Sequence, residues 1–168
     1  MCAQIYVRKM TPSDLPQVIE IDQALFGSKR FPTWPFSFQV YWREYNPDIR
    51  LVAELGEKLA GFIVGCFVVE EHDRSVLSLR HSGEHGQPYR QVGWIDMIGV
   101  RPDSQGTGVG RKLVDSFCDE CRRSNVDVRA VTTEDDLKLK RFLEAAGFKA
   151  REFAVYEKNR GLAPDRSP

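Results

Sequence analysis

The sequence predicts a single domain of the α/β (α+β) class. Apolar strand patterns alternate with amphipathic helical patterns from residue 5 to residue 158, with no internal repeat and no domain linker. The 168 residues are enough for one domain with a substantial core, and 42% hydrophobic with 29% charged residues is ordinary for a soluble globular protein. We therefore expect one domain over residues 1–158 and a disordered tail over 159–168.

The first half of the chain is expected to form a strand, two helices and a β-hairpin. Thr11 is a candidate helix N-cap, Pro12 fits the first turn, and Asp14 lies near the positive end of the helix. A second, shorter helix carries aromatic side chains, and a Gly56-Glu57 turn between two apolar runs is a hairpin signal. The expected elements are a strand over 5–10, helices over 11–25 and 37–45, and strands over 49–55 and 58–70.

The second half of the chain is expected to alternate strands and helices after a long polar segment. Residues 70–90 hold all three histidines, whose positions share no metal-like spacing, so a solvated loop or a ragged hairpin tip is favoured. The strand that follows is mostly apolar, as expected for a central strand covered on both faces. The expected elements are strands over 91–100, 126–133 and 150–158 and helices over 108–124 and 135–146.

The balance of charge restricts the classes of partner. Lys and Arg number 24, as do Asp and Glu, so the net charge is zero, whereas a general nucleic-acid binder usually carries a basic excess. This balance leaves room for a local basic site that binds a phosphorylated ligand. No segment approaches the ~20 apolar residues of a membrane span, and the start of the chain does not resemble a signal peptide. We expect a cytoplasmic protein that binds neither nucleic acid nor membrane. The sequence is compatible with both a monomer and a homodimer.

The cysteines predict neither a disulfide framework nor a metal site. Cys2, Cys66, Cys118 and Cys121 lack the spacing of a disulfide framework, which favours a reducing compartment. Cys118 and Cys121 form a C-x-x-C pair, but a zinc site needs a second pair of ligands and no histidine is placed to supply it. Both cysteines fall at helical spacing with Phe117, so we expect core packing and no metal.

The segment RPDSQGTGVGRKLVD places three glycines at the N-terminus of a predicted helix. Glycine is entropically costly there, so either a tight turn or a ligand close to the backbone must require it. A helix N-terminus presents free N–H groups and about half a positive charge, to which Arg111 and Lys112 add. Gly106, Gly108 and Gly110 would let an anion approach these amides, as in a phosphate or pyrophosphate cradle.

Three kinds of phosphate-binding loop compete for this segment. A Walker loop requires Gly-Lys followed by Ser or Thr, whereas Gly110 is followed by Arg111 and Lys112. A dinucleotide fingerprint requires G-x-G-x-x-G instead of G-x-G-x-G, and too little chain remains for a doubly wound sheet. The third kind fits: Gln105, Gly108 and Gly110, between a strand and a helix, strongly resemble the acetyl-CoA signature of the GNAT family of N-acetyltransferases. The later FLEAAGF segment and the order of elements also resemble this family.

The resemblance implies both the fold and the place of acetyl-CoA. It implies a mixed, mostly antiparallel sheet of six to seven strands, flanked by about four helices and open beside its fourth strand. In the family the pantetheine arm pairs with the backbone of that strand, a strand N–H polarises the acetyl carbonyl, and the acetyl group passes directly to an amine. The implied cofactor-binding residues are Ile98, Gly99 and Val100 on the strand, Gln105, Gly106, Thr107, Gly108, Val109, Gly110, Arg111 and Lys112 at the pyrophosphate, and Phe142 and Leu143 near the thiol.

The resemblance implies a catalytic base in this chain but not the usual catalytic acid. The family often places an acidic residue in the fourth strand to take the proton of the amine, which implies Asp96. Strand alternation puts Asp96 on the same face as Ile98 and Val100, although a carboxylate with an ordinary pKa near 4 is a poor base, and its other role is to order the strand or the substrate loop. Leu143 occupies the position of the tyrosine that commonly protonates the departing thiolate, so water or Tyr156 is expected to do so.

An aromatic and proline-rich segment over residues 26–45 falls where the family places part of its acceptor site. Phe31 and Trp34 are expected to contact the acceptor, and the small number of acidic residues favours a peptide N-terminus or a small amine over a polyamine. A non-catalytic acyl-CoA-binding or sensing domain is the main alternative, because the cofactor loop supports it equally. A nucleotide-binding domain is the third alternative.

Overall fold

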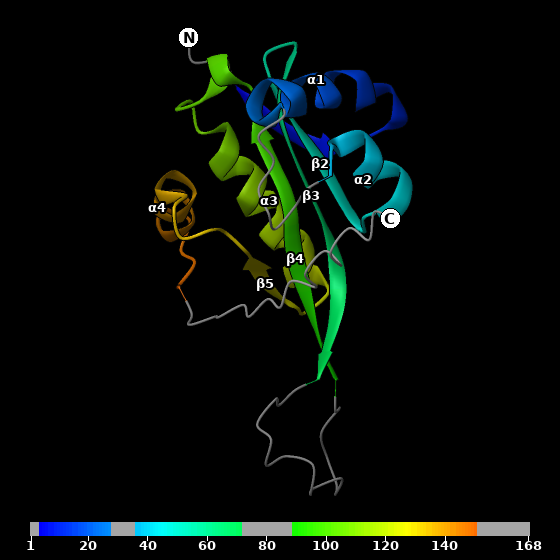
Figure 1. Ribbon diagram of the computed structural model, residues 1–168, viewed down its shortest axis with the longest axis vertical. Helices are drawn as coiled ribbons and strands as arrows, with labels where there is room; N and C mark the ends of the chain where they lie inside the picture. The colour runs from blue at the N-terminus through cyan, green and yellow to red at the C-terminus, as the bar shows by residue number, and fades with distance from the viewer. Residues whose placement is uncertain (1–3, 28–35, 72–88, 151–168) are drawn as a thin grey trace, which may run out of the picture.

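The computed structural model of the protein describes residues 4–27, 36–71 and 89–150, which form one five-stranded sheet with helices on both faces (Figure 1). The strands are β1 Ile5–Lys9, β2 Ile49–Leu55, β3 Lys58–Glu71, β4 Tyr89–Val100 and β5 Asp127–Ala130. They lie side by side in chain order, and neighbours are antiparallel except β4 and β5, which are parallel. The sheet is therefore mixed and mostly antiparallel, as expected.

Four α-helices and two short 3-10 turns accompany the sheet in the described ranges. The helices are α1 Leu15–Phe26, α2 Phe38–Tyr45, α3 Val109–Arg123 and α4 Leu137–Ala145, and the turns are Pro12–Asp14 and Pro102–Ser104. In Figure 1, α1 and α2 lie on one side of the sheet and α3 and α4 on the other. In the part of the chain that the structure describes, no helix has the length and apolar content that crossing a membrane requires.

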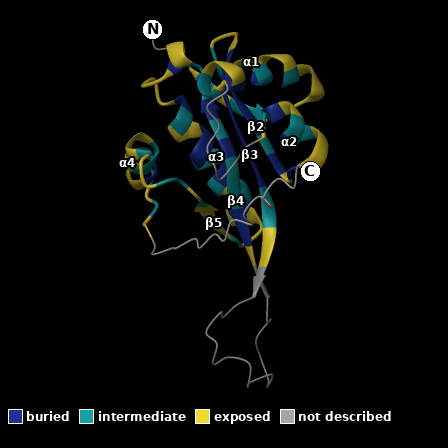
Figure 2. Cartoon of the chain, viewed as in Figure 1, coloured by how far each residue is buried: buried dark blue, intermediate teal, exposed yellow. Residues whose placement is uncertain are grey.

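Two hydrophobic clusters, one on each face of the sheet, form the core. Strand alternation separates them, because Phe62 and Val64 of β3 pack with α1 and α2, whereas Ile63 between them packs with α3. Phe117 of α3 is fully buried in the second cluster. Figure 2 shows the buried residues along the centre of the sheet and the inward sides of the helices. The helices thus cover the sheet on both faces.

The predicted elements lie where the sequence places them, with differences at their ends. β5 spans Asp127–Ala130 instead of 126–133, because it pairs with β4 over only these four residues. The described residues hold five strands where six to seven were expected. The strand expected over 150–158 falls almost wholly outside the described residues, and the tail 159–168 lies entirely outside them. Of the polar segment expected over 70–90, the two ends belong to strands, since β3 runs to Glu71 and β4 begins at Tyr89, and residues 72–88 lie outside the described residues.

A nearly buried carboxylate holds the turn between β1 and α1. Asp14 Oδ2 accepts hydrogen bonds from the Thr11 N–H at 2.7 Å and from the Thr11 hydroxyl at 2.8 Å. The Arg8 guanidinium donates to both oxygens of Asp14 at 2.8 Å and to Glu54 of β2 at 2.8 Å. The hydrogen bonds from Arg8, and then those from Thr11, hold the pKa of Asp14 well below its ordinary value.

Asp14→Asn is expected to lower the free energy of unfolding at pH 7 by about 1–2 kcal/mol, because the charged hydrogen bonds to Arg8 are lost. A group whose pKa is depressed in the folded state stabilises the fold above its unfolded pKa, about 3.9 for Asp, and loses this contribution as the pH falls towards the folded value. The difference between wild type and variant should therefore shrink below about pH 4. Urea unfolding at pH 7 and pH 3 measures it, and an equal difference at both values would contradict the assignment.

Candidate functional site

A cleft opens where β4 and β5 diverge. β5 pairs with β4 only from Val92 to Ile95, and within the described ranges no strand pairs with this edge of β4 from Asp96 to Val100. The cleft has a volume of about 520 Å³ and is lined by β4, the loop after it, α3, α4, the end of β5 and the end of α1. The sheet is therefore open beside its fourth strand, where the sequence predicts the opening.

The backbone of β4 turns hydrogen-bonding groups towards this cleft. The Arg101 N–H donates to the Ala60 carbonyl on the β3 side at 2.8 Å. Because hydrogen bonding alternates along an antiparallel pair, the N–H and C=O groups of Val100 and Ile98 point the other way, towards the open edge. The Gln105 side-chain amide donates to the Val100 carbonyl from that side at 3.3 Å. This stretch of backbone can pair with an extended, amide-bearing ligand.

The three glycines after β4 fit both explanations given for them, a tight turn and a ligand close to the backbone. Gly106 and Gly108 have φ values of +78° and +93°, which side chains rarely adopt, so the turn itself requires glycine at these two positions. Gly110 does not have a positive φ, but a Cβ there would lie 3.4 Å from the Phe142 ring and from a Val100 methyl group. All three glycines line the cleft, so the turn also brings bare backbone against the cavity.

The first turn of α3 presents amide groups at the same place. The Lys112 N–H donates to the Gly108 carbonyl at 3.0 Å, and the N–H groups before it in the helix have no partner within the helix. Gly108, Gly110 and Arg111 line the cleft. The positive end of the helix dipole therefore faces the cavity, which suits an anionic group.

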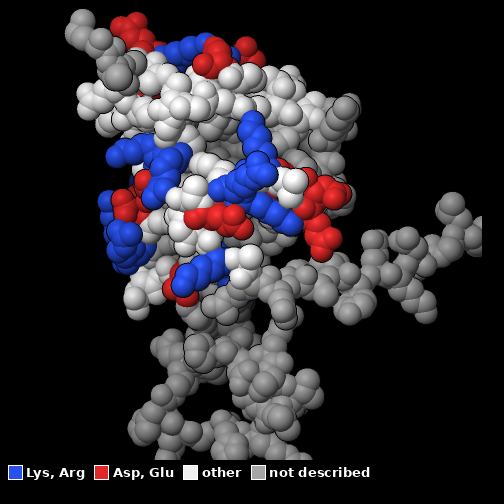
Figure 3. All heavy atoms as spheres, turned by 90° about the vertical axis from the view of Figure 1, so that its left-hand side faces the viewer, with Lys and Arg blue, Asp and Glu red and all other residues white. Residues whose placement is uncertain are grey.

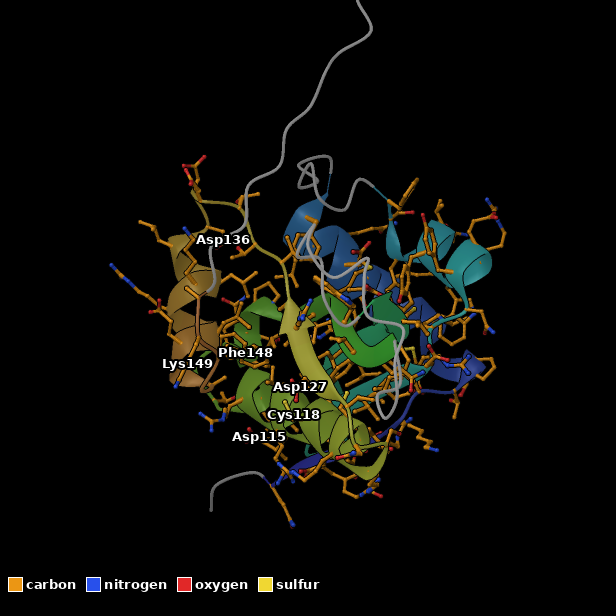
Figure 4. The ribbon with its side chains drawn as sticks, turned by 90° about the horizontal axis from the view of Figure 1, so that it is seen from below. Asp115, Cys118, Asp127, Asp136, Phe148 and Lys149 are labelled. Carbon is orange, nitrogen blue, oxygen red and sulfur yellow. The ribbon has the colours of Figure 1, made fainter. Side chains whose placement is uncertain are left out.

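A polar bridge connects the glycine loop to α4. Lys138 Nζ donates to Gln105 Oε1 at 2.8 Å, and Asp136 accepts from the Leu139 N–H at 2.9 Å as the N-cap of α4. In Figure 4, Asp136 lies at one end of α4, and Phe148 and Lys149 lie at the other. The bridge fixes the start of α4 next to the loop.

Most of the predicted cofactor-binding residues line the cleft, namely Ile98, Val100, Gln105, Gly106, Gly108, Gly110, Arg111, Phe142 and Leu143. The others lie beside it. The Val109 side chain is fully buried in the core, the Thr107 hydroxyl donates to the Ser104 carbonyl at 2.6 Å, and Gly99 faces α1. Lys112 is exposed on α3. The predicted Phe31, Trp34 and Tyr156 lie outside the described residues.

Sequence reasoning missed the side of the cleft that β5 and α1 provide. Thr132 and Thr133 follow β5, and Leu25 and Phe26 end α1. The available signal was that β4 and β5 are consecutive parallel strands, whose carboxyl ends lie at the same edge of a sheet. α1 gives no such signal, because only its packing on the sheet brings its last turn to the cleft.

A β-bulge in β4 falls at the predicted acidic residue. In the register of β3 and β4, the pairs Val64–Met97 and Gly65–Ile95 follow each other directly. Asp96 is therefore an extra residue of β4 that has no partner on β3, which defines a β-bulge. Bulges are common next to active sites because they redirect a side chain.

The bulge reverses the face that strand alternation predicts for Asp96. Asp96 and Met97 both face α1 and α2, since Met97 belongs to the cluster there and the Asp96 carboxylate contacts Tyr41 of α2. Ile98 and Val100 pack on the opposite face, under α3. The expectation that Asp96 shares a face with Ile98 and Val100 is therefore wrong, although Asp96 still lines the cleft.

The carboxylate of Asp96 lies between α2 and β3. The Tyr41 hydroxyl donates to Asp96 Oδ2 at 2.7 Å, and the Cys66 thiol also hydrogen-bonds to the carboxylate. Burial raises the pKa of Asp96 and the charge of Asp48 raises it further, while the hydrogen bonds from Tyr41 and Cys66 lower it, and the pKa ends above its ordinary value. Asp96 is therefore a stronger base than an exposed aspartate.

The C-x-x-C pair is part of the core, as the sequence predicts. Cys121 is fully buried and Cys118 packs partly against the same cluster. Burial raises the pKa of Cys121 to about 11, so its thiol stays protonated at neutral pH. Figure 4 shows Cys118 and Asp115 on α3. Among the residues that the structure describes, no group of three or more His, Cys, Asp and Glu side chains is arranged to hold a metal ion.

Charged side chains around α3 and α4 are mixed in sign. Figure 3 shows basic and acidic residues interspersed on this face. Arg111 is engaged within the fold, because its guanidinium donates to Asp115 at 2.9 Å and to the Ala145 carbonyl at 2.6 Å. Anion binding at the start of α3 would thus depend first on backbone amides, with side-chain charge as an addition.

Comparison with known proteins identifies one family. A family model described as the Acetyltransferase (GNAT) family matches residues 15–148. The match spans β4, the glycine loop, α3 and α4. It therefore includes all the described residues that line the cleft. No curated protein sequence matches the chain.

Solved structures resemble the whole fold at low sequence identity. AAC(6')-Iy, solved with a bisubstrate analogue of CoA, is 16% identical with a TM-score of 0.67, over 94% of this chain and 99% of that one. An aminoglycoside antibiotic 6'-N-acetyltransferase from Acinetobacter baumannii has the same values. A transcriptional regulator from Bacillus halodurans is 21% identical with a TM-score of 0.65, over 93% and 100% of the two chains. At these identities the similarity concerns the fold alone.

Proposed function

The chain belongs to the GNAT acetyltransferase family, and from that premise we propose that its acceptor is the α-amine of a peptide N-terminus or a small amine. As a member of this family it transfers the acetyl group of acetyl-CoA to an amine. We place the reaction in the cleft because of one observation. The edge of β4 is open from Asp96 to Val100, and the strand leads directly into the glycine loop and the start of α3.

The chemistry of the cleft fits acetyl-CoA. This molecule supplies a reactive acetyl thioester at the end of an amide-bearing arm, with a pyrophosphate at the other end. The outward-facing backbone groups of Ile98 and Val100 pair with the arm, and the first-turn amides of α3 after Gly108 hold the pyrophosphate. Phe142 and Leu143 flank the thiol end.

Asp96 takes the proton of the acceptor amine, directly or through water. An ammonium group must lose a proton before its nitrogen can attack a carbonyl carbon. An aspartate with an ordinary pKa is a weak base for this step, but burial raises the pKa of Asp96 and brings it nearer to the working pH. A backbone N–H of β4 stabilises the negative charge that develops on the carbonyl oxygen.

Protonation of the departing thiolate does not come from Leu143, which has no acidic hydrogen. A thiol with a pKa of about 8.5 is a fair leaving group at neutral pH, so water suffices. Tyr156 is the second candidate for this role. We expect a slow enzyme as a consequence of the missing acid.

The acceptor class is tested by comparing two kinds of amine. At pH 7, deprotonation costs about 4–5 kcal/mol for a lysine side chain but only about 1 kcal/mol for an α-amine with a pKa near 8. A peptide with a free N-terminus should therefore be acetylated at least about tenfold faster than the same peptide with a blocked N-terminus and one lysine. The release of free CoA thiol measures both rates.

An aminoglycoside serves as the third acceptor in this assay, because two of the similar structures belong to enzymes that acetylate such compounds. An aminoglycoside carries several amino groups, so faster turnover of it than of the free N-terminus would overturn the expected preference for a peptide N-terminus or a small amine over a polyamine. Binding of acetyl-CoA in calorimetry without turnover of any acceptor would favour the non-catalytic acyl-CoA-binding alternative.

A further inference from the structure

Tyr41 is a buried tyrosine whose hydroxyl reaches the site from α2. Its side chain is 0% exposed, and its hydroxyl lies 2.7 Å from Asp96 Oδ2 and 3.8 Å from Cys66 Sγ. A buried hydroxyl that donates to a carboxylate restricts the orientation of that carboxylate. The carboxylate needs such partners because its burial raises the pKa of Asp96 and so disfavours its ionised form.

The helix that carries Tyr41 is itself fixed at its N-terminus. The Phe38 N–H donates to the fully buried Asp22 of α1 at 3.1 Å, and the Val40 N–H donates to Ser37 Oγ at 3.4 Å. The Phe38 ring also meets Phe62 of β3 edge to face, with 5.0 Å between centroids. These contacts bind α2 to α1 and to the sheet, so the Tyr41 hydroxyl is presented from a rigid element.

We propose that Tyr41 is a positioning residue for Asp96, whose hydroxyl fixes the orientation of the carboxylate at the cleft and stabilises its ionised form. This inference rests on the proposed role of Asp96 as the base. It assigns to α2 a part in proton transfer in addition to its part in the core. The bulge lets Asp96 and Met97 face the same side of the sheet, so the carboxylate meets Tyr41 while Ile95 and Ile98 pack under α3.

The groups that face Asp96 have defined protonation states. Tyr41 from α2 has its pKa raised far above the ordinary value by burial and then by the charge of Asp96, so it remains a donor. Cys66 from β3 has its pKa raised by burial and by Asp96, so it remains a neutral thiol. Asp48, before β2, adds negative charge that raises the pKa of Asp96. Only the two hydrogen-bond donors, Tyr41 and Cys66, oppose that rise.

The test is the pH dependence of kcat/KM in Tyr41→Phe. Loss of the hydroxyl removes the first of the two groups that lower the pKa of Asp96, so the acid limb of the profile should move to higher pH. We expect a shift of about 0.5–1 pH unit, with kcat on the plateau reduced several-fold and the KM for acetyl-CoA unchanged. A residue that only packs in the core would lower activity at every pH without moving the limb.

Three further variants keep the outcome decisive. Tyr45→Phe removes a hydroxyl from the next turn of α2, where the ring is 46% exposed and stacks on Tyr41, and the limb should stay in place. Cys66→Ala removes the second donor and should shift the limb in the same direction by less, which tests the same geometry if Tyr41→Phe folds poorly. A wild-type limb in a folded Tyr41→Phe overturns the positioning role. Asp96→Asn removes the base itself. A wild-type pH profile in that variant would contradict the proposed function instead of the positioning role of Tyr41.

Discussion

Asp96→Asn is expected to lower kcat at pH 7 by about tenfold, because only about a tenth of an α-amine with a pKa near 8 is deprotonated at that pH, and to regain activity as the pH rises past the pKa of the acceptor amine. The asparagine keeps an oxygen that can accept the Tyr41 hydrogen bond, so the site should keep its shape while it loses the base. An α-amine with a pKa near 8 is mostly deprotonated above about pH 9 and then needs no base. Rates of thiol release from pH 6 to pH 10, with saturating acetyl-CoA, measure this recovery.

The shape of the profile separates catalysis from structure in this variant. A loss of activity that is equal at every pH would assign Asp96 to substrate binding or to the stability of β4. Asp48→Asn is the matched control, because it removes a nearby exposed carboxylate that contributes only through its charge to the pKa of Asp96. That control should leave activity at high pH unchanged and move the acid limb slightly to lower pH.

The role of Asp96 also marks the limit of what the sequence could predict. Its position in the fourth strand follows from local pattern, but its face depends on the register between β3 and β4. The extra residue in that register arises from the pairing of Gly65 with Ile95, which lie thirty positions apart in the chain. Strict alternation assumes a regular strand, so it places Asp96 on the wrong face.

The glycine loop was predictable because its chemistry is local. Gly106 and Gly108 lie next to the helix that they start, and the need for free amides there can be read from consecutive residues. Lys138, which bridges to Gln105, comes from 33 positions further along the chain. Nothing in the sequence near α4 indicates this pairing, because it depends on where β5 and α4 lie relative to β4 in the folded chain.

Tyr41 was predictable as a core residue but not as a partner of the site. The aromatic side chains of α2 indicate a helix with a buried face, and the Tyr41 ring is buried accordingly. Its hydroxyl meets a carboxylate 55 positions later in the chain, and only the packing of α2 on the sheet brings the two together. A buried tyrosine needs a hydrogen-bond partner, so the general need was foreseeable while the identity of the partner was not.

Gly110→Val is expected to weaken acetyl-CoA binding by about 100-fold, or about 2.7 kcal/mol, while the fold stays intact. Gly110 has no positive φ, so its backbone accepts a side chain. The new Cβ would lie 3.4 Å from both the Phe142 ring and a Val100 methyl group, and the two further methyl groups of valine would occupy the cleft that Gly110 lines. Isothermal titration with acetyl-CoA measures the affinity, and a thermal melt checks the fold.

Two related variants show whether the lost affinity comes from the cleft or from the backbone. Gly110→Ala adds one carbon at ordinary contact distance and should weaken binding by less than about tenfold. Gly108→Val places a side chain at a φ of +93° and should lower the thermal midpoint as well as the affinity, because the turn into α3 is then strained. If a folded Gly110→Val binds acetyl-CoA as tightly as wild type, the start of α3 does not hold the pyrophosphate, and the ligand must lie elsewhere along β4.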